Sequence, residues 1–168
     1  MSKEVYIRNA TEADIESLTG IYNHYVVNSH ITFDLKPVSI ENRLEWLSRY
    51  NRDDAHRLLV AETDQRVLGY ASSSQFRVKP AYRNSVETTI YLDPDATGMG
   101  VGQRLYAALL DELTNSRVHR CYGIVALPND ASVKLHRQLG FEEVGHFSEV
   151  GFKFDRYWDT LWLEKRFP

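Results

Sequence analysis

The chain has 168 residues, of which 43% are hydrophobic and 12% aromatic, a composition typical of one globular domain with a buried core. A formal net charge of −3 without a long basic run argues against a nucleic-acid-binding protein. The single cysteine, Cys121, excludes an internal disulfide framework and any multi-cysteine metal site, and its apolar neighbours favour a core residue over a nucleophile. The histidines show no metal-ligand spacing, so we expect no metal.

The distribution of hydrophobic residues shows neither a membrane-spanning segment nor a targeting signal. No stretch approaches about 18 consecutive apolar residues, and the N-terminus lacks an apolar signal region. We therefore expect a soluble, cytoplasmic protein that forms a single domain over residues 1–168 and binds neither membrane nor nucleic acid.

A strand and an amphipathic helix are predicted first. Residues 4–8 alternate in the manner of a strand. Thr11 suits a helix N-cap, and the acidic residues that follow it favour the positive end of the helix dipole. The apolar face of this helix consists of Ile15, Leu18, Ile21, Tyr22, Tyr25 and Val26.

Residues 28–37 break the helical pattern and are predicted to form a loop that carries Ile31, Thr32 and Phe33. Loops with apolar residues often cover a functional site, but the same residues could simply pack on the core. The sequence leaves both interpretations open. Ser39 then suits the N-cap of a second helix, whose predicted core side consists of Ile40, Leu44 and Leu47, with Trp46 alongside.

The middle of the chain contains a predicted hairpin and a central strand. Residues 58–62 and 67–74 form the hairpin, and residues 75–83 mix aromatic and basic side chains. Residues 86–92 are mostly β-branched or aromatic, as a largely buried strand prefers, and Asp93-Pro94-Asp95 ends it. A helical period then follows at Val101, Leu105, Ala108, Leu109 and Leu113.

The last part of the chain contains more strands and one short helix. Residues 121–127 are a predicted strand, Asn129-Asp130 caps a helix, and Gly140 suits its C-terminal glycine. Residues 143–150 and 160–165 complete the sheet, with 151–159 as their connection. The whole pattern predicts one α/β domain with a mixed sheet.

Three alternate glycines, Gly98, Gly100 and Gly102, stand directly before the helix that begins near Val101. Bare backbone amides at a helix N-terminus form a nest for an anion such as phosphate or pyrophosphate. The residues after Gly102 do not fit a P-loop, and the spacing does not fit the dinucleotide fingerprint. A glycine-rich turn without a ligand is the alternative.

The stretch Thr97-Gly98-Met99-Gly100-Val101-Gly102 resembles the pyrophosphate loop of the GNAT N-acetyltransferases, with Thr97 where that family usually has Gln or Arg. The order of the predicted elements from residue 4 to residue 166 is similar to the order in that fold. The resemblance implies the GNAT fold, with a mixed, mostly antiparallel sheet of about seven strands and about four helices.

Further matches narrow the resemblance to one subgroup. Phe76-Arg77-x-Lys79-x-Ala81-Tyr82-Arg83, Val86-Glu87 and Asn129-Asp130-Ala131-Ser132 with His136 look like the phosphinothricin and methionine sulfoximine N-acetyltransferases. Gly151-Phe152-Lys153-Phe154 and Trp158-Asp159 agree with that subgroup too.

The resemblance implies acetyl-coenzyme A as co-substrate. The glycine nest would hold its pyrophosphate, and the backbone of the central strand would pair with its pantetheine arm and stabilise the developing oxyanion. The cofactor-binding residues implied in this way are Ile90, Tyr91, Leu92, Gly98, Met99, Gly100, Val101, Gly102, Gln103, Asn129 and Ser132.

Two residues are candidates for catalysis. Glu87 lies in a run that should be mostly buried, where desolvation raises the pKa of a carboxylate and suits it as a general base. An ion pair with Arg77 or Arg83 is the structural alternative. His136 stands where relatives have a tyrosine that protonates the leaving thiolate, and packing is the alternative role for it.

Acceptors of this subgroup are amino acids, whose carboxylate suits an arginine. The substrate-binding candidates are Phe33, Arg77, Val78, Lys79, Glu87, Thr88 and Thr89. Another amine, such as a polyamine, an aminoglycoside or a protein N-terminus, is an alternative acceptor. A non-catalytic acetyl-coenzyme A sensor and a nucleotide-binding module are alternatives of other classes. The resemblance also implies a homodimer.

Overall fold

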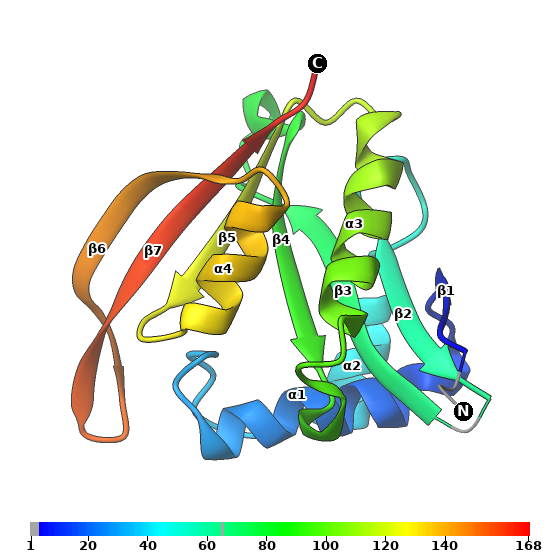
Figure 1. Ribbon diagram of the computed structural model, residues 1–168, viewed down its shortest axis with the longest axis horizontal. Coiled ribbons are helices and arrows are strands. Elements are labelled where there is room, and N and C mark those ends of the chain that lie inside the picture. Colours follow the sequence, from blue (N-terminus) through cyan, green and yellow to red (C-terminus); the bar gives the residue numbers. More distant parts are fainter. Residues whose placement is uncertain (1–3, 65) are drawn as a thin grey trace.

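The computed structural model describes residues 4–64 and 66–168. The strands form one seven-stranded sheet in the order β1-β2-β3-β4-β5-β7-β6 (Figure 1). Neighbouring strands are antiparallel except for β4 and β5, which are parallel. The strands are β1 (Tyr6–Asn9), β2 (Leu58–Thr63), β3 (Arg66–Gln75), β4 (Ser85–Leu92), β5 (Arg120–Ala126), β6 (Glu142–Lys153) and β7 (Arg156–Arg166).

Helices cover both faces of the sheet. The four α-helices are α1 (Ile15–Asn28), α2 (Ile40–Leu47), α3 (Val101–Thr114) and α4 (Asp130–Gln138). In Figure 1, α3 and α4 lie in front of the sheet, and the β6–β7 hairpin extends beyond them at one edge. Among the described residues, no helix is long and apolar enough to cross a membrane. These elements confirm the predicted α/β architecture.

The core has two parts because alternate strand residues point to opposite faces. In β2, Leu59 and Ala61 join the larger cluster with α3, and Leu58 and Val60 join a smaller cluster with α1. Cys121 is fully buried in the larger cluster, as expected.

Helix ends follow the predicted capping residues. The Ser39 hydroxyl accepts the Asn42 amide at the start of α2. The Asn129 side-chain oxygen accepts the Ser132 amide at the start of α4, and Gly140 has a left-handed φ of +84° just after that helix ends. These local signals were sufficient to locate the helices.

Two local expectations were wrong. The connection predicted at 151–159 is mostly strand, because β6 and β7 extend to a tight turn at Phe154 and Asp155. In α2, Ile40 and Leu44 are 40% and 38% exposed, and the buried residue is Arg43. The Arg43 guanidinium lies 3.6 Å from the centre of the Trp46 ring and 4.8 Å from that of Tyr22, so aromatic rings cover this charged side chain.

Candidate active site

The parallel ladder between β4 and β5 ends early. Its last pair is Thr88 with Gly123, whereas the ladder between β4 and β3 continues to Leu92, opposite Gly69. Within the part of the chain that the structure describes, β4 therefore pairs only with β3 over residues 89–92. The backbone groups that face the missing neighbour are open to an extended ligand with amide groups of its own.

The glycine loop follows the open end of β4. Gly98 and Gly100 have left-handed φ values of +74° and +76°, a conformation that side chains disfavour. A Cβ at either position would meet no atom within 4 Å, so the loop faces open space. Gly100 is the N-cap of α3, and the first amides and the positive dipole end of this helix therefore form a site for an anion.

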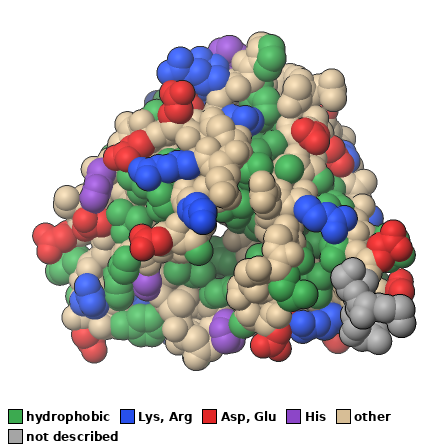
Figure 2. All heavy atoms as spheres, in the orientation of Figure 1, with side chains coloured by type: hydrophobic (Ala, Val, Ile, Leu, Met, Phe, Trp, Pro, Cys, Tyr) green, Lys and Arg blue, Asp and Glu red, His purple; other side chains and the backbone are tan. Residues whose placement is uncertain are grey.

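A pocket of about 460 Å³ connects the open strand and the glycine loop. The end of β4, the loop, the start of α3 and one side of α4 form its walls, and the surface is hollowed between these elements (Figure 2). Most of the predicted cofactor residues line it: Ile90, Tyr91, Leu92, Gly98, Gly100, Gly102, Gln103, Asn129 and Ser132.

Met99 and Val101 are the exceptions among the predicted cofactor residues. The Met99 side chain is 70% exposed and does not line the pocket, whereas the Val101 side chain is buried in the core, so Val101 can offer only its backbone amide. The pocket is also lined by Ile31 of the predicted loop and by Thr97 of the glycine stretch, neither of which is in the predicted cofactor set. The sequence did not indicate the other lining residues as site residues, and these are Tyr25, Ala131, Lys134, Leu135 and Gln138. Lys134, Leu135 and Gln138 lie three, four and seven residues after Ala131, so helical spacing from Ala131 relates the α4 members of this set.

A narrow hollow of about 60 Å³ extends the site between β4 and β5, and reaches Thr89, Ile124 and His136. His136 is only 4% exposed. Its Nδ1 lies 2.8 Å from the Ser132 carbonyl oxygen, and its Nε2 lies 3.1 Å from the Tyr106 hydroxyl. Burial lowers the pKa of His136, so the imidazole is neutral at pH 7 and has a protein partner at each nitrogen.

Glu87 lies on β4 one residue before the strands separate, opposite Tyr122 of β5. Its side chain is half-buried, and burial raises its pKa while the charge of Arg77 opposes that shift. Among the residues that the structure describes, neither Arg77 nor Arg83 forms an ion pair with it. The carboxylate is therefore free to accept a proton from a ligand.

Aromatic side chains form a wall beside Glu87. The Phe76 ring stacks on Tyr122 at 4.5 Å, and the Arg77 guanidinium lies 4.4 Å from the centre of the Phe76 ring and 5.8 Å from that of Trp162. This stacking leaves the Arg77 charge at the exposed edge of the aromatic wall, where an anionic group can reach it. Trp162 and Tyr122 lie on this face because strand residues alternate, which the sequence alone did not reveal.

Other acceptor candidates are placed less favourably. Thr88 is 2% exposed, and its hydroxyl lies 2.7 Å from that of Tyr106 on the α3 side of the sheet, opposite the face that carries Glu87. Its side chain therefore points away from Glu87, and Thr88 lines the narrow hollow beside His136. Val78 is 85% exposed and Lys79 is exposed, and, like Glu87 and Arg77, neither residue lines the pocket or its narrow extension.

The predicted loop at 28–37 lies against the site. Ile31 lines both the pocket and its narrow extension. Phe33 packs on the β6–β7 hairpin, where its ring lies directly on Gly151. Of the two interpretations of this loop, the structure favours the one in which it covers a site.

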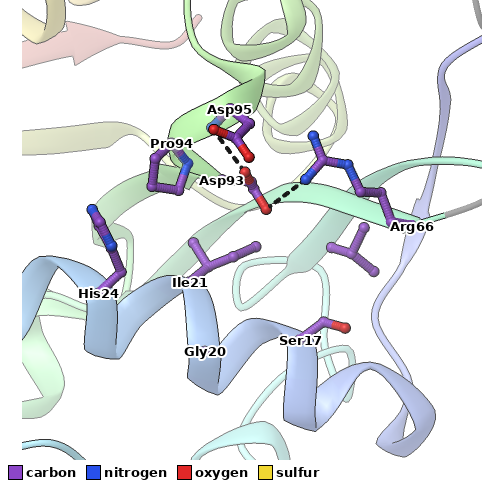
Figure 3. A pocket seen from close by; sticks show the side chains of 9 residues that line it. Ser17, Gly20, Ile21, His24, Arg66, Asp93, Pro94 and Asp95 are labelled. Carbon is purple, nitrogen blue, oxygen red and sulfur yellow. Dashed lines mark hydrogen bonds and ion pairs between the residues drawn. The ribbon is translucent and has the colours of Figure 1, made fainter.

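Another hollow, of about 510 Å³, lies between α1 and the segment that follows β4 (Figure 3). Asp93 and Asp95 line it, and Asp93 already binds Arg66 at 3.0 Å and the Asp95 amide at 2.9 Å. Carboxylates repel a phosphate, so this hollow does not compete with the glycine loop for an anion.

Arg43 is a buried cation that the sequence did not identify. It is 5% exposed, its guanidinium lies 3.6 Å from the centre of the Trp46 ring, and its Nη2 donates to the Tyr70 hydroxyl at 3.0 Å. Its Nε has no hydrogen-bond partner among the described residues.

No group of acidic, histidine or cysteine side chains that could hold a metal ion occurs in the described part of the chain.

The family model described as "Acetyltransferase (GNAT) domain" matches residues 7–162. The chain belongs to the GNAT acetyltransferase family. The protein is therefore an acetyltransferase. The open strand and the glycine loop are features of a GNAT fold rather than of a nucleotide-binding module.

Two relatives of this GNAT domain carry specific names. The chain is 50% identical over 165 residues to a phosphinothricin N-acetyltransferase of Streptomyces coelicolor, with 96% of each chain covered. It is 34% identical over 158 residues to an L-methionine sulfoximine/L-methionine sulfone acetyltransferase of Pseudomonas paraeruginosa, with 94% of this chain and 92% of the relative covered.

Solved structures share the complete fold. A phosphinothricin acetyltransferase of Sinorhizobium meliloti in complex with AcCoA is 33% identical, with a TM-score of 0.92 over 97% of this chain and 88% of that one. A ribosomal-protein-alanine N-acetyltransferase of Brucella melitensis is 41% identical, with a TM-score of 0.92 over 96% of this chain and 99% of that one. The names of these neighbours thus include two kinds of acceptor.

Proposed function

We propose that this GNAT domain transfers the acetyl group of acetyl-coenzyme A to the amino group of a small amino acid analogue such as phosphinothricin, methionine sulfoximine or methionine sulfone. The observation that carries the proposal is the position of Glu87. Its unpaired carboxylate lies where β4 and β5 separate, next to the open strand that continues to the glycine loop.

The pocket fits the parts of the co-substrate in order along its length. The amides of Gly98–Gly102 and the start of α3 would hold the pyrophosphate, and the exposed Lys134 on the opposite wall supplies a cation for phosphate. The open backbone of Ile90, Tyr91 and Leu92 would pair with the pantetheine amides. Acetyl-coenzyme A supplies the electrophilic thioester carbonyl at the end of this path.

Glu87 would act on the acceptor amine. An ammonium ion has no lone pair for attack, so the amine must lose a proton to a base, directly or through a water molecule. Burial raises the pKa of Glu87 toward neutral pH, and a base with a pKa near the working pH transfers protons more effectively. A backbone amide of residues 89–92 would stabilise the negative charge that forms on the carbonyl oxygen.

The acceptor would lie between Glu87, the aromatic wall and the loop residue Phe33. Arg77 would bind its carboxylate or phosphinate from the exposed edge of that wall, and Thr89, on the same face as Glu87, would offer a hydroxyl. Lys79 and Val78 could contact an acceptor only from the edge of this space, since both are exposed.

The role of His136 as proton donor to the thiolate stays a proposal. The ring lines the narrow hollow, which supports that role. Donation from Nε2 would require this nitrogen to carry the proton and to give up its contact with Tyr106. The alternative is that His136 fixes α4 against β5, and the two roles differ in their effect on turnover.

A protein N-terminus is the second candidate acceptor, because one solved neighbour is named for that activity. Polyamines and aminoglycosides are disfavoured, since the acceptor side carries the cation Arg77 and a basic 75–83 segment. The test is thiol release from acetyl-coenzyme A with phosphinothricin, methionine sulfoximine, methionine sulfone, spermidine and an alanine-starting peptide. Release only with the first three is expected.

Two other outcomes would overturn the proposal in different ways. Release only with the peptide would assign a protein acceptor. Tight binding of acetyl-coenzyme A by calorimetry without release from any acceptor in the panel would favour a sensor domain.

We also propose that the protein forms a homodimer through the β6–β7 hairpin. Side chains of this hairpin expose large apolar surfaces to solvent, and such surfaces on a soluble domain often mark an interface. They are Val144, Phe147, Val150, Phe152, Phe154 and Tyr157. Light scattering should give twice the chain mass, and Phe152→Lys should give the monomer mass.

A further inference from the structure

Lys153 is a buried lysine that forms no ion pair with an acidic side chain in the described ranges, 4–64 and 66–168. It lies near the end of β6 and is 3% exposed. Its Nζ donates to the carbonyl oxygen of Thr32 at 2.8 Å and lies 5.1 Å from the centre of the Phe154 ring. Lysine is almost never fully buried unless its charge is compensated, so this position requires an explanation.

The partner of Lys153 belongs to the loop that covers the site. Thr32 lies between Ile31, which lines the pocket, and Phe33, whose ring lies on Gly151 of the same hairpin. From the other side, the Tyr22 hydroxyl of α1 lies 2.8 Å from the Thr32 hydroxyl. The loop is therefore held between α1 and the β6–β7 hairpin.

Other contacts of the hairpin with this loop are of a different kind. The His30 ring stacks on Trp158 of β7 at 4.0 Å. The Trp158 indole donates to the Lys153 carbonyl at 2.8 Å, so Trp158 contacts both the loop residue His30 and Lys153. Stacked rings can slide, whereas a hydrogen bond from a buried ammonium to a carbonyl fixes the position of the backbone.

We propose that Lys153 is a positioning residue for the acceptor site, because its ammonium group fixes the Thr32 carbonyl and with it the placement of Ile31 and Phe33. The proposal rests on the proposed function, since it requires an amine acceptor to bind beneath this loop. Burial lowers the pKa of Lys153 and the charge of Asp34 opposes that shift, in agreement with the enclosed environment.

The variant Lys153→Met tests this role, because methionine fills a similar volume without the donor. We expect the KM for the amine acceptor to rise about tenfold, as for the loss of one hydrogen bond to a charged group. The kcat at saturating acceptor should stay within about twofold, because Glu87 is not touched. The Kd of acetyl-coenzyme A by calorimetry should rise less than the acceptor KM, because Ile31 lines that pocket but the glycine loop is not touched.

A matched control exists on the neighbouring strand. Lys165 of β7 also donates from Nζ to a carbonyl, that of Leu139, at 2.8 Å, but at the end of α4 away from the loop. Lys165→Met removes the same kind of bond and should leave the acceptor KM unchanged. Gly151→Ala moves the loop by a different route, since its Cβ would overlap the Phe33 ring, and should also raise the acceptor KM.

Hydrogen exchange at Ile31–Asp34 without any substrate gives an independent readout. Faster exchange in Lys153→Met than in Lys165→Met is expected. Equal exchange together with an unchanged acceptor KM would overturn the proposal. If the unmodified protein acetylates no acceptor, the proposed function fails, whereas the exchange result still decides whether Lys153 holds the loop.

Discussion

The imidazole of His136 lies directly on the backbone of Gly123, so that a Cβ at Gly123 would overlap ring atoms of the histidine. Gly123 is also the last β5 residue that pairs with β4. The strands therefore separate directly after the residue on which the buried histidine lies. This contact exists only because residue 123 has no side chain.

Gly123→Ala should consequently displace His136. We expect a loss of about 1–3 kcal/mol in the free energy of unfolding, the range for an overpacked core position. Urea denaturation measures it. The control Gly20→Ala in α1, where a Cβ meets no atom within 4 Å, should be neutral or stabilising because alanine favours a helix. Equal losses at both sites would contradict the proposed contact.

His136 should also make stability depend on pH. Burial lowers its pKa in the folded state, so the unfolded chain takes up a proton more readily. The stabilisation is fully present above the ordinary pKa of about 6.5 and decreases as the pH falls below that value. In His136→Gln this dependence should be weaker between pH 7.5 and 5.5, whereas His24→Gln, at an exposed position on α1, should behave like the parent.

Turnover of His136→Gln separates the two roles of this histidine. A thiolate that needs a proton from Nε2 should leave more slowly, by about 10²-fold or more, with little change in acetyl-coenzyme A affinity. Parent-like turnover at a temperature where the variant is folded would assign His136 to packing alone. Stopped-flow thiol detection measures the rate.

Glu87→Gln should lower kcat by about 10²–10⁴-fold, the usual contribution of a general base, and leave the Kd of acetyl-coenzyme A near its normal value. In the parent, kcat/KM should fall as the pH decreases through the raised pKa of Glu87, because the protonated carboxyl cannot accept the amine proton. The variant should lack this acidic limb. Glu41→Gln, at an exposed position on α2, is the control, and unchanged turnover in Glu87→Gln would remove Glu87 from the mechanism.

Gly100→Val should abolish acetyl-coenzyme A binding in calorimetry. The residue has a φ of +76°, which a β-branched side chain strongly disfavours, and the new side chain would enter the pocket that receives the pyrophosphate. Gly20→Ala again serves as the control. Retained affinity would show that the anion binds elsewhere.

Arg43→Ala should cost about 3 kcal/mol of unfolding free energy. It leaves a cavity beside Trp46 and removes the donor to the hydroxyl of Tyr70, which is 1% exposed. Arg49→Ala, six residues later in an exposed pair with Glu45, should cost less than about 0.5 kcal/mol. Similar losses in the two variants would show that the aromatic packing of Arg43 contributes little.

Short-range patterns were sufficient to predict the order and type of the elements. The helix caps at Ser39 and Asn129 act within four residues, and the glycine loop before α3 depends on backbone freedom at Gly98 and Gly100. Such features depend on neighbours along the chain, which the sequence displays directly. The family resemblance then indicated which ligand the loop would suit.

Only the tertiary structure decided where these features meet. β4 and β5 pair in parallel although α3 separates them in the sequence. The sequence contains no signal for the residue at which this pairing stops. The contacts of Arg43 with Tyr70, of His136 with Tyr106 and of Lys153 with Thr32 likewise join different elements that are distant in the sequence. Local propensity cannot specify such contacts, because they are set by how the layers pack once the sheet has formed.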